Sequence, residues 1–261
     1  MRGFRLRQIL LPTFATVLLI AIWQVSTGLF DIPSYLIPSP LKVLSALQAG
    51  LIKGTLWPHI WATFSAFVLG YIAGCAGALL LAIIISEVSW LEQAVYPIIV
   101  AFQAIPKVAL APVIIVWFGF GIESKIVMVG LICFFPCFLN ALVGLKAHDE
   151  NLVDLYRAFG AGRRQIFLNV KLPSAATTIF AGLEISVVLA LLGVVMSELV
   201  ASRAGLGHVI AAAGADFNVA MMFACIIILS VMGVLSTMLI AAVRRQVVFW
   251  ERAGTSSRRR R

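Results

Sequence analysis

The sequence predicts an all-α membrane protein with six transmembrane helices, and its composition, hydropathy and charge distribution each support this prediction. Hydrophobic residues make up 62% of the 261 residues and charged residues 12%, whereas about a quarter of the residues in soluble domains are charged. A helix needs about 20 apolar residues to cross the bilayer, where unpaired backbone amides are not tolerated. Six stretches meet this length: residues 9–30, 63–85, 96–118, 126–145, 175–200 and 221–243.

The first stretch follows three arginines, as a secretory signal would. Its apolar run is too long for a signal peptide and lacks a clear small-residue cleavage site, so we expect a retained first helix. We find no internal repeat and expect a single transmembrane domain over residues 1–261. Its core spans about 60–245, with a cytoplasmic loop at about 146–173 and a basic tail at 244–261.

The orientation follows from the basic residues. Fifteen of the twenty lie before the first stretch, in the loop at 146–171 or in the tail. Because basic residues near helix ends stay on the cytoplasmic side, we expect both termini and this loop inside. The basic residues expected outside are Lys42, Lys53, Lys125 and Arg203.

The net charge of +9 does not point to nucleic acid. Most of the basic residues set the orientation of the protein in the membrane. No pattern of basic and aromatic residues typical of a nucleic-acid-binding groove accompanies them. The terminal arginines 258–261 are instead candidates for contact with anionic lipid heads.

A short external helix is predicted after the first stretch. Ser39 precedes Pro40, a combination of N-cap and first-turn proline that starts helices. Leu41, Leu44 and Leu47 then recur at helical spacing. We expect an amphipathic helix on the outer surface with a structural role.

The third stretch contains three prolines, Pro97, Pro106 and Pro112, each of which bends or ends a helix. Such interruptions survive at membrane depth only where protein or a watery cavity satisfies the freed carbonyls. A pathway lining is therefore predicted here. Lys107 follows Pro106 directly, and its ammonium group either reaches the interface or lies in a wet vestibule of that pathway.

The four cysteines, Cys75, Cys133, Cys137 and Cys225, all fall inside predicted spans. Cys133 and Cys137 share a helix face as a possible metal pair, but no histidine or carboxylate stands nearby in sequence to complete a site. We expect buried free thiols and no metal site.

The segment at 201–219 is too polar and glycine-rich to cross the membrane. We expect an external loop with a short or re-entrant helix at 206–213. This helix would act either as a lip or gate of the pathway or as a packing element.

The loop at 146–173 contains an amphipathic helix of about two turns. Leu152, Leu155 and Phe159 recur at i, i+3 and i+7, and Gly160 ends the helix. The polar residues of this segment are Asp154, Arg157, Arg163 and Arg164. So short a helix is not stable alone in water. It must dock either on its own membrane domain and lipid heads or in a groove of another protein, and periodicity does not separate the two.

The spacing of this loop resembles the cytoplasmic loop of the membrane subunits of bacterial ABC importers. That pattern is Glu-Ala-Ala, three residues, Gly, nine residues, an aliphatic residue, one more, and Leu-Pro. The matching residues here are Asp154, Leu155, Tyr156, Gly160, Val170, Leu172 and Pro173. The spacing is kept in full, and the departures are the conservative Asp154 and the bulky Leu155 and Tyr156.

Further segments resemble the branch of this family that imports nitrate, taurine, aliphatic sulfonates and some pyrimidines. They are LIPSPLKVLSAL, IPKVALAPVIIVWFGFG, GLEISVVLALLG and SELVASRAGLGHVI. The resemblance implies the type I ABC importer fold, a permease homodimer in the bacterial cytoplasmic membrane, a cytoplasmic ATPase dimer and an extracytoplasmic solute-binding protein. No G-x-x-x-x-G-K-[ST] loop occurs, so this chain is expected to hold no cofactor, and the partner ATPase binds ATP.

The resemblance also implies roles for individual residues. The ATPase-coupling residues would be Asp154, Leu155, Tyr156, Arg157, Phe159, Gly160, Ala161, Leu172 and Pro173. The Leu172-Pro173 pair would act as an elbow that passes motion into the fifth span.

Candidate pathway residues are Pro106, Lys107, Glu184 and Glu198. Members of the family that handle sulfonates often have a basic residue where Glu184 stands. A carboxylate there would repel an anion unless it pairs with Lys107 or faces the ATPase side. Glu198 would either hold the external loop through Arg203 or meet the solute.

Two other classes of function are weighed against the importer. A stand-alone channel or secondary carrier would need no ATPase, but few ionisable groups lie at membrane depth, chiefly Lys107 and Glu184. An intramembrane enzyme would need a nucleophile, acid-base pair or metal cluster, yet His59, His148 and His208 are scattered over different loops.

Overall fold

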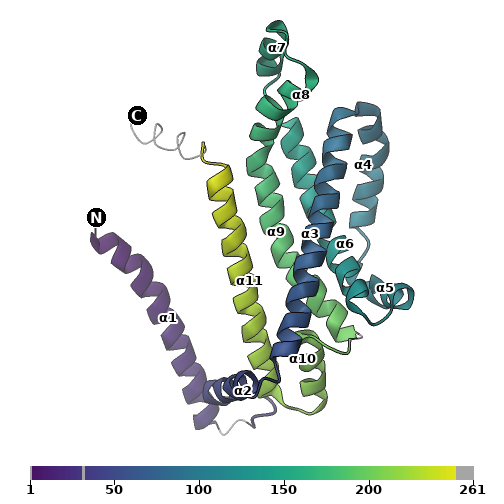
Figure 1. The fold of residues 1–261 in the computed structure, drawn as a ribbon. Coiled ribbons are helices and arrows are strands. Elements are labelled where there is room, and N and C mark those ends of the chain that lie inside the picture. The colour runs from purple at the N-terminus through teal and green to yellow at the C-terminus, as the bar shows by residue number, and fades with distance from the viewer. Residues whose placement is uncertain (1, 31–32, 201, 251–261) are drawn as a thin grey trace.

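The computed structural model of the chain describes residues 2–30, 33–200 and 202–250, and these residues form helices without a strand (Figure 1). The all-α prediction is thereby confirmed. The arginine run at 258–261, predicted to contact lipid heads, lies outside the described residues.

Three long helices pack together at the centre: α3 (Trp57–Glu87), α6 (Ile122–Lys146) and α9 (Leu172–Val200). A fourth, α11 (Val219–Val247), runs alongside α9 (Figure 1). Helices α3 and α6 approach so closely that a Cβ atom at Gly74 would lie 2.5 Å from the backbone oxygen of Gly130. Small residues permit such contact between membrane helices, where packing rather than the hydrophobic effect drives association.

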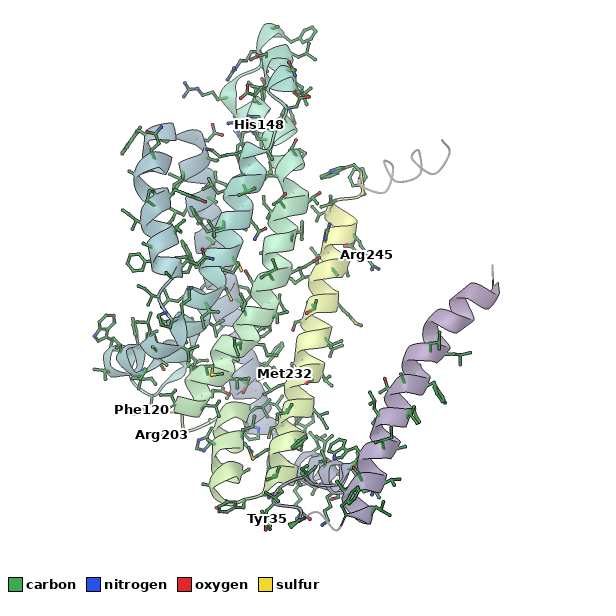
Figure 2. All side chains as sticks on the ribbon, turned by 180° about the vertical axis from the view of Figure 1, so that it is seen from behind. Tyr35, Phe120, His148, Arg203, Met232 and Arg245 are labelled. Carbon is green, nitrogen blue, oxygen red and sulfur yellow. The ribbon has the colours of Figure 1, made fainter. Side chains whose placement is uncertain are left out.

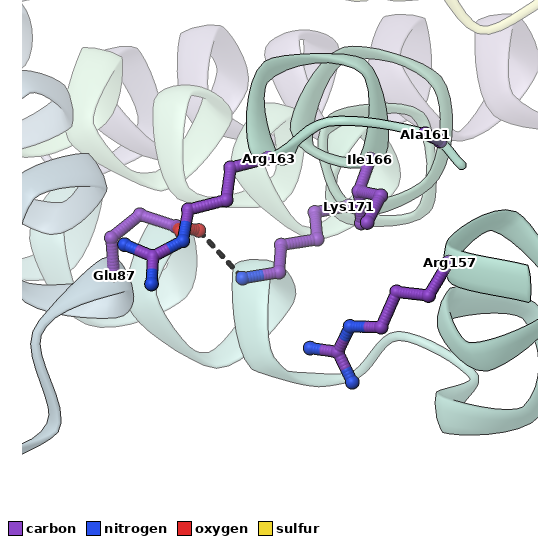
Figure 3. Close-up of a pocket in the computed structure, with 6 residues that line it drawn as sticks. All are labelled: Glu87, Arg157, Ala161, Arg163, Ile166 and Lys171. Atoms are coloured by element: carbon purple, nitrogen blue, oxygen red, sulfur yellow. Dashed lines mark hydrogen bonds and ion pairs between the residues drawn. The ribbon is translucent and has the colours of Figure 1, made fainter.

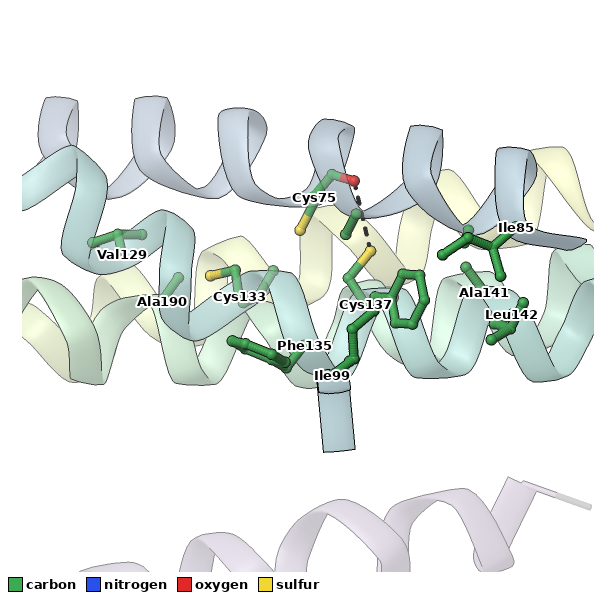
Figure 4. Close-up of a cluster of buried hydrophobic side chains, with 14 of the residues drawn as sticks. Cys75, Ile85, Ile99, Val129, Cys133, Phe135, Cys137, Ala141, Leu142 and Ala190 are labelled. Atoms are coloured by element: carbon green, nitrogen blue, oxygen red, sulfur yellow. Dashed lines mark hydrogen bonds between the residues drawn. The ribbon is translucent and has the colours of Figure 1, made fainter. Parts of the chain in front are cut away.

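The core between α3 and α6 contains three of the four cysteines (Figure 4). All four are buried, as predicted. The Cys133 thiol donates to the carbonyl oxygen of Ser186 at 3.3 Å, and the Cys137 thiol to that of Cys75 at 3.8 Å. These thiols therefore act as small apolar side chains with weak donors inside the bundle.

The described residues contain four helices long and apolar enough to cross a membrane, and a bent pair of helices makes a fifth span if it is counted as one. The first predicted span belongs to α1 (Arg2–Leu29), which stands apart from the bundle and contacts α2 (Figure 1). Its apolar part at Thr13–Leu29 is shorter than the others. The sixth crossing thus stays a prediction.

The third predicted span is broken. It consists of α4 (Ser89–Gln103), the 3-10 helix η1 (Lys107–Leu110) and α5 (Ala111–Phe118). The segments Gln93–Gln103 and Lys107–Phe118 meet at 84°. The break falls at Pro106, which has no N–H group to continue the helix. The interruption is confirmed, and the span predicted over residues 96–118 is bent sharply at that point.

Two short helices lie at one end of the bundle (Figure 1). They are α2 (Pro40–Ile52) and α10 (Leu206–Ala215). The Ser39 side chain accepts a hydrogen bond from the amide of Lys42, so the predicted cap is present. Figure 2 shows Tyr35 and Arg203 toward this end and His148 toward the opposite end, which separates the two loop sets as the charge distribution predicts.

Candidate functional site

The loop predicted to meet a partner protrudes beyond the bundle at the end opposite α2 and α10 (Figure 1). It contains α7 (Glu150–Ala158) and α8 (Arg163–Ile166). The Asp149 carboxylate caps α7 by accepting from the amide of Asn151 at 2.9 Å. This bond satisfies one of the amides that have no partner within the helix.

Gly160 ends α7 as predicted. Its φ of +77° lies in the left-handed region, which glycine adopts without a steric penalty. The reversal allows the amide of Ala161 to donate to the carbonyl of Tyr156 at 3.0 Å. This bond from residue i to i−5 is the Schellman closure of a helix end.

One face of α7 packs inward on a small apolar cluster of the loop. Val153 is buried against Ile166 and Val170, and Tyr156 and Ala161 pack around them. The bulky Tyr156, which departs from the alanine of the importer pattern, therefore fills the interior of the loop. Tyr156 and Ala161 support the loop from within, and neither belongs to its outermost surface.

The other face of α7 is apolar and exposed. Leu155 is 51% exposed and Phe159 is 83% exposed, while Leu152 is partly so. Asp154 and Arg157 form an exposed ion pair at 3.0 Å beside them. Exposed ion pairs contribute at most about 1 kcal/mol, so this pair adds polarity rather than stability to the surface.

A cavity of about 440 Å³ lies at the base of the loop (Figure 3). Its lining residues are Glu87, Arg157, Ala161, Arg163, Ile166 and Lys171. The Lys171 ammonium donates to the Glu87 carboxylate at 2.6 Å. Because Glu87 is the last residue of α3, this ion pair joins the base of the loop to the central bundle.

The expected elbow at Leu172-Pro173 is wrong. Residues Arg163–Val200 form one continuous helical span, in which the turn η2 (Phe167–Lys171) is a π-helix. The amide of Leu172 donates to the carbonyl of Phe167, five residues back. Pro173 cannot donate at all, and the wider π turn accommodates it without a break.

The predicted pathway residues do not form one site. The Lys107 ammonium donates to the carbonyl of Gln103 at 3.3 Å and lies 4.7 Å from the centre of the Phe135 ring. It therefore sits at the break of the third span, held by the end of α4 and by a cation–π contact. Pro106 stands immediately before it at the same break.

The hypothesis that Glu184 pairs with Lys107 is wrong. The Glu184 carboxylate lies 3.5 Å from the guanidinium of Arg244, in the last turn of α11. Both side chains are partly exposed. The other alternative considered for this carboxylate, that it faces the ATPase side, stays a prediction.

Glu198 does reach the loop that leads into α10, but its partner is not Arg203. The carboxylate is fully buried and bonds to the Lys125 ammonium at 3.0 Å and to the Thr63 hydroxyl. It also accepts from the amide of Gly207. Lys125, expected in an external loop, lies in the first turn of α6 and is buried.

Sequence reasoning missed Lys125 and Thr63. Lys125 opens a strongly apolar helix, and a charged residue at that place signals a buried partner. Thr63 carries no comparable signal, because a threonine within an apolar run is common.

Comparison with known proteins places this geometry in context. Residues 66–248 match the family described as binding-protein-dependent transport system inner membrane component. A riboflavin transport system permease protein of Chloroflexus aurantiacus is 35% identical, with 90% of this chain and 88% of that protein covered.

Two further relatives carry other names. A formylaminopyrimidine transport permease protein of Halalkalibacterium halodurans is 32% identical over 94% of this chain and 97% of that protein. A putative aliphatic sulfonates transport permease protein of Bacillus subtilis is 29% identical over 94% of this chain and 87% of that protein.

A solved structure shares the fold. The chain aligns with inward-facing MetNI, a methionine ABC transporter, at a TM-score of 0.59 and 21% identity, covering 74% of this chain and 94% of the other. At this identity the likeness shows a common architecture, the type I ABC importer transmembrane fold.

Proposed function

Because this chain belongs to the family of binding-protein-dependent transport system inner membrane components, we propose that its loop at 149–170 is the surface on which a cytoplasmic ATPase acts. Family membership makes the chain a permease subunit of an ABC importer, a transport protein and not an enzyme. It also implies ATPase and solute-binding partners and a place in the inner membrane.

The observation that carries this proposal is the exposed apolar face of α7. Phe159 is 83% exposed and Leu155 51% exposed, on a helix whose inner face is already filled by Val153. Apolar side chains gathered on a protruding helix mark a protein contact. A groove on the ATPase would cover them in the helix-in-groove manner.

The ATPase, in this proposal, binds the ATP. The ATPase closes when it binds nucleotide, and the closed ATPase shifts the permease between two conformations. The size of this shift depends on how much more tightly the ATPase binds α7 in one conformation than in the other. The base of the loop is joined to α3 by the Lys171–Glu87 pair and runs without a break into α9. Movement of α7 would therefore pass directly into the central bundle.

We further propose a homodimer with both termini in the cytoplasm. A row of large apolar side chains on α11 is exposed in the single chain and is the surface that a second copy would cover in part. The row includes Val231, Val234, Leu235, Met238 and Leu239. Lipid and the second copy would share the covering of this row.

For the solute we propose a small nitrogen heterocycle of the pyrimidine-containing type. Two relatives above 30% identity, the riboflavin and formylaminopyrimidine permeases, are named by a solute that contains a pyrimidine ring. The sulfonate and taurine relatives are 29% and 27% identical, which makes a small sulfonate or similar anion the second candidate. The Glu184 carboxylate, in the cytoplasmic half of this proposed orientation, would repel an anion, although Arg244 offsets part of its negative charge.

The test of the loop assignment is a substitution at Phe159. Phe159→Ser is expected to lower co-purification of the ATPase about tenfold or more, as for a residue at the centre of an interface, while the amount of permease in the membrane stays unchanged. Ile52→Ser is the matched control, since Ile52 is 84% exposed on α2 at the other end of the bundle. The assignment would be wrong if Phe159→Ser kept wild-type ATPase binding and uptake.

The solute is tested with the purified assembly in liposomes. Labelled riboflavin, a labelled pyrimidine and labelled taurine are supplied with the cognate binding protein and ATP. Uptake of a heterocycle alone supports the first candidate, and uptake of taurine alone supports the second.

A further inference from the structure

The external end of the bundle contains a buried cluster that joins four helices; we call it the Glu198 cluster. The Glu198 carboxylate, on α9, accepts from the Thr63 hydroxyl of α3 at 3.0 and 2.9 Å and from the Lys125 ammonium of α6 at 3.0 Å. It also accepts from the amide of Gly207, on α10, at 2.9 Å. The side chains of Lys125 and Glu198 are 7% and 0% exposed.

The same cluster binds the backbone that leads into α10. The Lys125 ammonium also donates to the carbonyl of Ala204. The Thr63 hydroxyl accepts from the amide of Leu206 at 2.8 Å, and a ring nitrogen of His59 accepts from the amide of Gly205 at 3.1 Å. Three successive amides at the start of α10, which have no partner within the helix, are thus all bonded to side chains of α3 and α9.

The two glycines of this segment allow the close approach. A Cβ atom at Gly205, whose φ is +128°, would lie 2.0 Å from an oxygen of the Glu198 carboxylate. A Cβ atom at Gly207 would lie 2.7 Å from the Cβ of Glu198. The backbone of the loop is therefore shaped around this carboxylate, and residues with side chains do not fit there.

Stability alone does not explain such a cluster. Removing two charges from water is costly, and apolar residues of similar size are often as stable in place of a buried ion pair. What the charged pair supplies is a specific arrangement: the loop is held in one position relative to Lys125 and Glu198, because separation from them leaves buried charges without partners.

The position of Glu198 along its helix connects the Glu198 cluster to the loop at the other end of the bundle. Glu198 lies two residues before the outer end of the continuous helix Arg163–Val200, whose other end carries α7. These 38 residues extend about 57 Å at 1.5 Å per residue. The loop at the cytoplasmic end and α10 at the external end are therefore attached to the same helix.

We infer that Lys125, Thr63 and Glu198 are positioning residues of the transport cycle. They attach α10 to the outer ends of α3, α6 and α9 together, so that the movement started at α7, which is joined to both α3 and α9, displaces α10 and changes access to the pathway from outside. This inference rests on the proposed action of an ATPase on α7, and it assigns to α10 the role of a gate rather than a packing element. Arg203 takes no part.

A cavity lies beside the cluster. Its volume is about 210 Å³, and it lies between α3, α6 and the external loop. Lys125 and Ala204 line it together with Ala62, Phe120, Gly121, Ile122, Ser202 and Arg203.

The experiment uses the complete transporter in liposomes with its ATPase and binding protein. Lys125→Met and Glu198→Gln are combined, since the double variant leaves no buried charge unpaired and is the form expected to fold. Arg203→Gln is the matched control, an exposed cation of the same loop. Ala211→Cys, on the exposed side of α10, reports its position through an impermeant thiol reagent, because all four native cysteines are buried.

In the wild type and in Arg203→Gln, the labelling rate at Ala211→Cys is expected to change when ATP is added. In the double variant the rate should no longer respond to ATP, and uptake per ATP hydrolysed should fall about tenfold, a typical size for coupling between two sites. The basal ATPase rate and the amount of folded complex should stay close to wild type. A purely structural role would lower uptake and hydrolysis together.

The inference is overturned if the double variant couples uptake to ATP as the wild type does, or if its loss follows only the amount of folded protein. If the double variant does not fold, Thr63→Val decides by the same two measurements, since it removes only the hydroxyl. Failure of the wild type to take up solute with ATP would instead contradict the proposed function itself.

Discussion

Single residues in the loop at 149–170 divide into two groups by what they touch. Val153, Tyr156 and Ala161 hold the loop together, whereas Leu155 and Phe159 are exposed. Substitutions in the two groups are expected to have different effects. Changes in the first alter the shape of the loop, and changes in the second alter only what it can bind.

Gly160 offers the sharpest prediction at this scale. Gly160→Ala should destabilise the end of α7 by roughly 1–2 kcal/mol, the penalty of a left-handed residue that carries a Cβ. The end of α7 would then be less well ordered for binding to the ATPase. Uptake should therefore fall, while basal ATP hydrolysis by the assembly persists. Uptake and hydrolysis are measured together in liposomes.

The control for Gly160 lies two residues further on. Gly162 has a φ of −74°, and a Cβ atom there would meet nothing within 4 Å. Gly162→Ala should leave uptake unchanged. Equal effects of the two substitutions would show that the positive φ of Gly160 is not what matters.

At the scale of elements, the packing of α3 on α6 depends on backbone contact. Gly74→Ala would place a Cβ 2.5 Å from the backbone oxygen of Gly130 and 2.7 Å from its Cα. Backbone atoms of a packed helix cannot move aside as a side chain can, so the helices must separate. We expect a loss of about 1–3 kcal/mol in stability, as for other overpacked cores, measured as a lower unfolding temperature in detergent.

Gly77, on the same helix, provides the comparison. A Cβ atom there meets nothing within 4 Å, and alanine favours a helix by up to about 1 kcal/mol over glycine. Gly77→Ala should therefore unfold at the wild-type temperature or above it. A similar loss in both variants would refute the close approach of α3 and α6.

The π turn at the start of α9 gives a second prediction for an element. Pro173→Ala restores an amide donor, so a regular α-helix can replace the wider turn η2. In an α turn the amide bonds to the carbonyl four residues back instead of five. This change would rotate the segment before the turn by about 100° relative to α9, which is the angle of one residue in an α-helix. Uptake per ATP hydrolysed should fall, while the amount of protein in the membrane should not.

The control for Pro173 is Pro40→Ala, which changes a proline in the first turn of α2, at the end of the bundle opposite α7. No π turn is present there, and coupling should be normal. If Pro173→Ala also coupled normally, the direction of α7 would not depend on this turn.

At the scale of the whole molecule, the charge distribution and the two sets of loops predict one orientation. A fluorescent protein fused after Arg261 should be fluorescent, and alkaline phosphatase fused there should be inactive, because both report a cytoplasmic C-terminus. Phosphatase fused after Gly54, in the turn between α2 and α3, should be active. Phosphatase activity at Arg261 with none at Gly54 would reverse the orientation.

The sequence alone predicted those structural features that depend on residues close together in the chain. The lengths of the long apolar helices, the break at Pro106, the cap at Ser39 and the stop at Gly160 all follow from residues close together in the chain. The spacing of the loop was equally informative about the family. These features survive any tertiary arrangement because bilayer thickness and backbone geometry dictate them.

Only the tertiary structure decided which residues meet. Glu198 pairs with Lys125, 73 residues away, and Glu184 with Arg244 rather than Lys107. It also decided which face of α7 packs on Val170 and which stays exposed, and that Leu172-Pro173 lies within an unbroken helix. Such pairings depend on the rotation of each helix about its axis, which changes by about 100° with every residue and which hydropathy does not record.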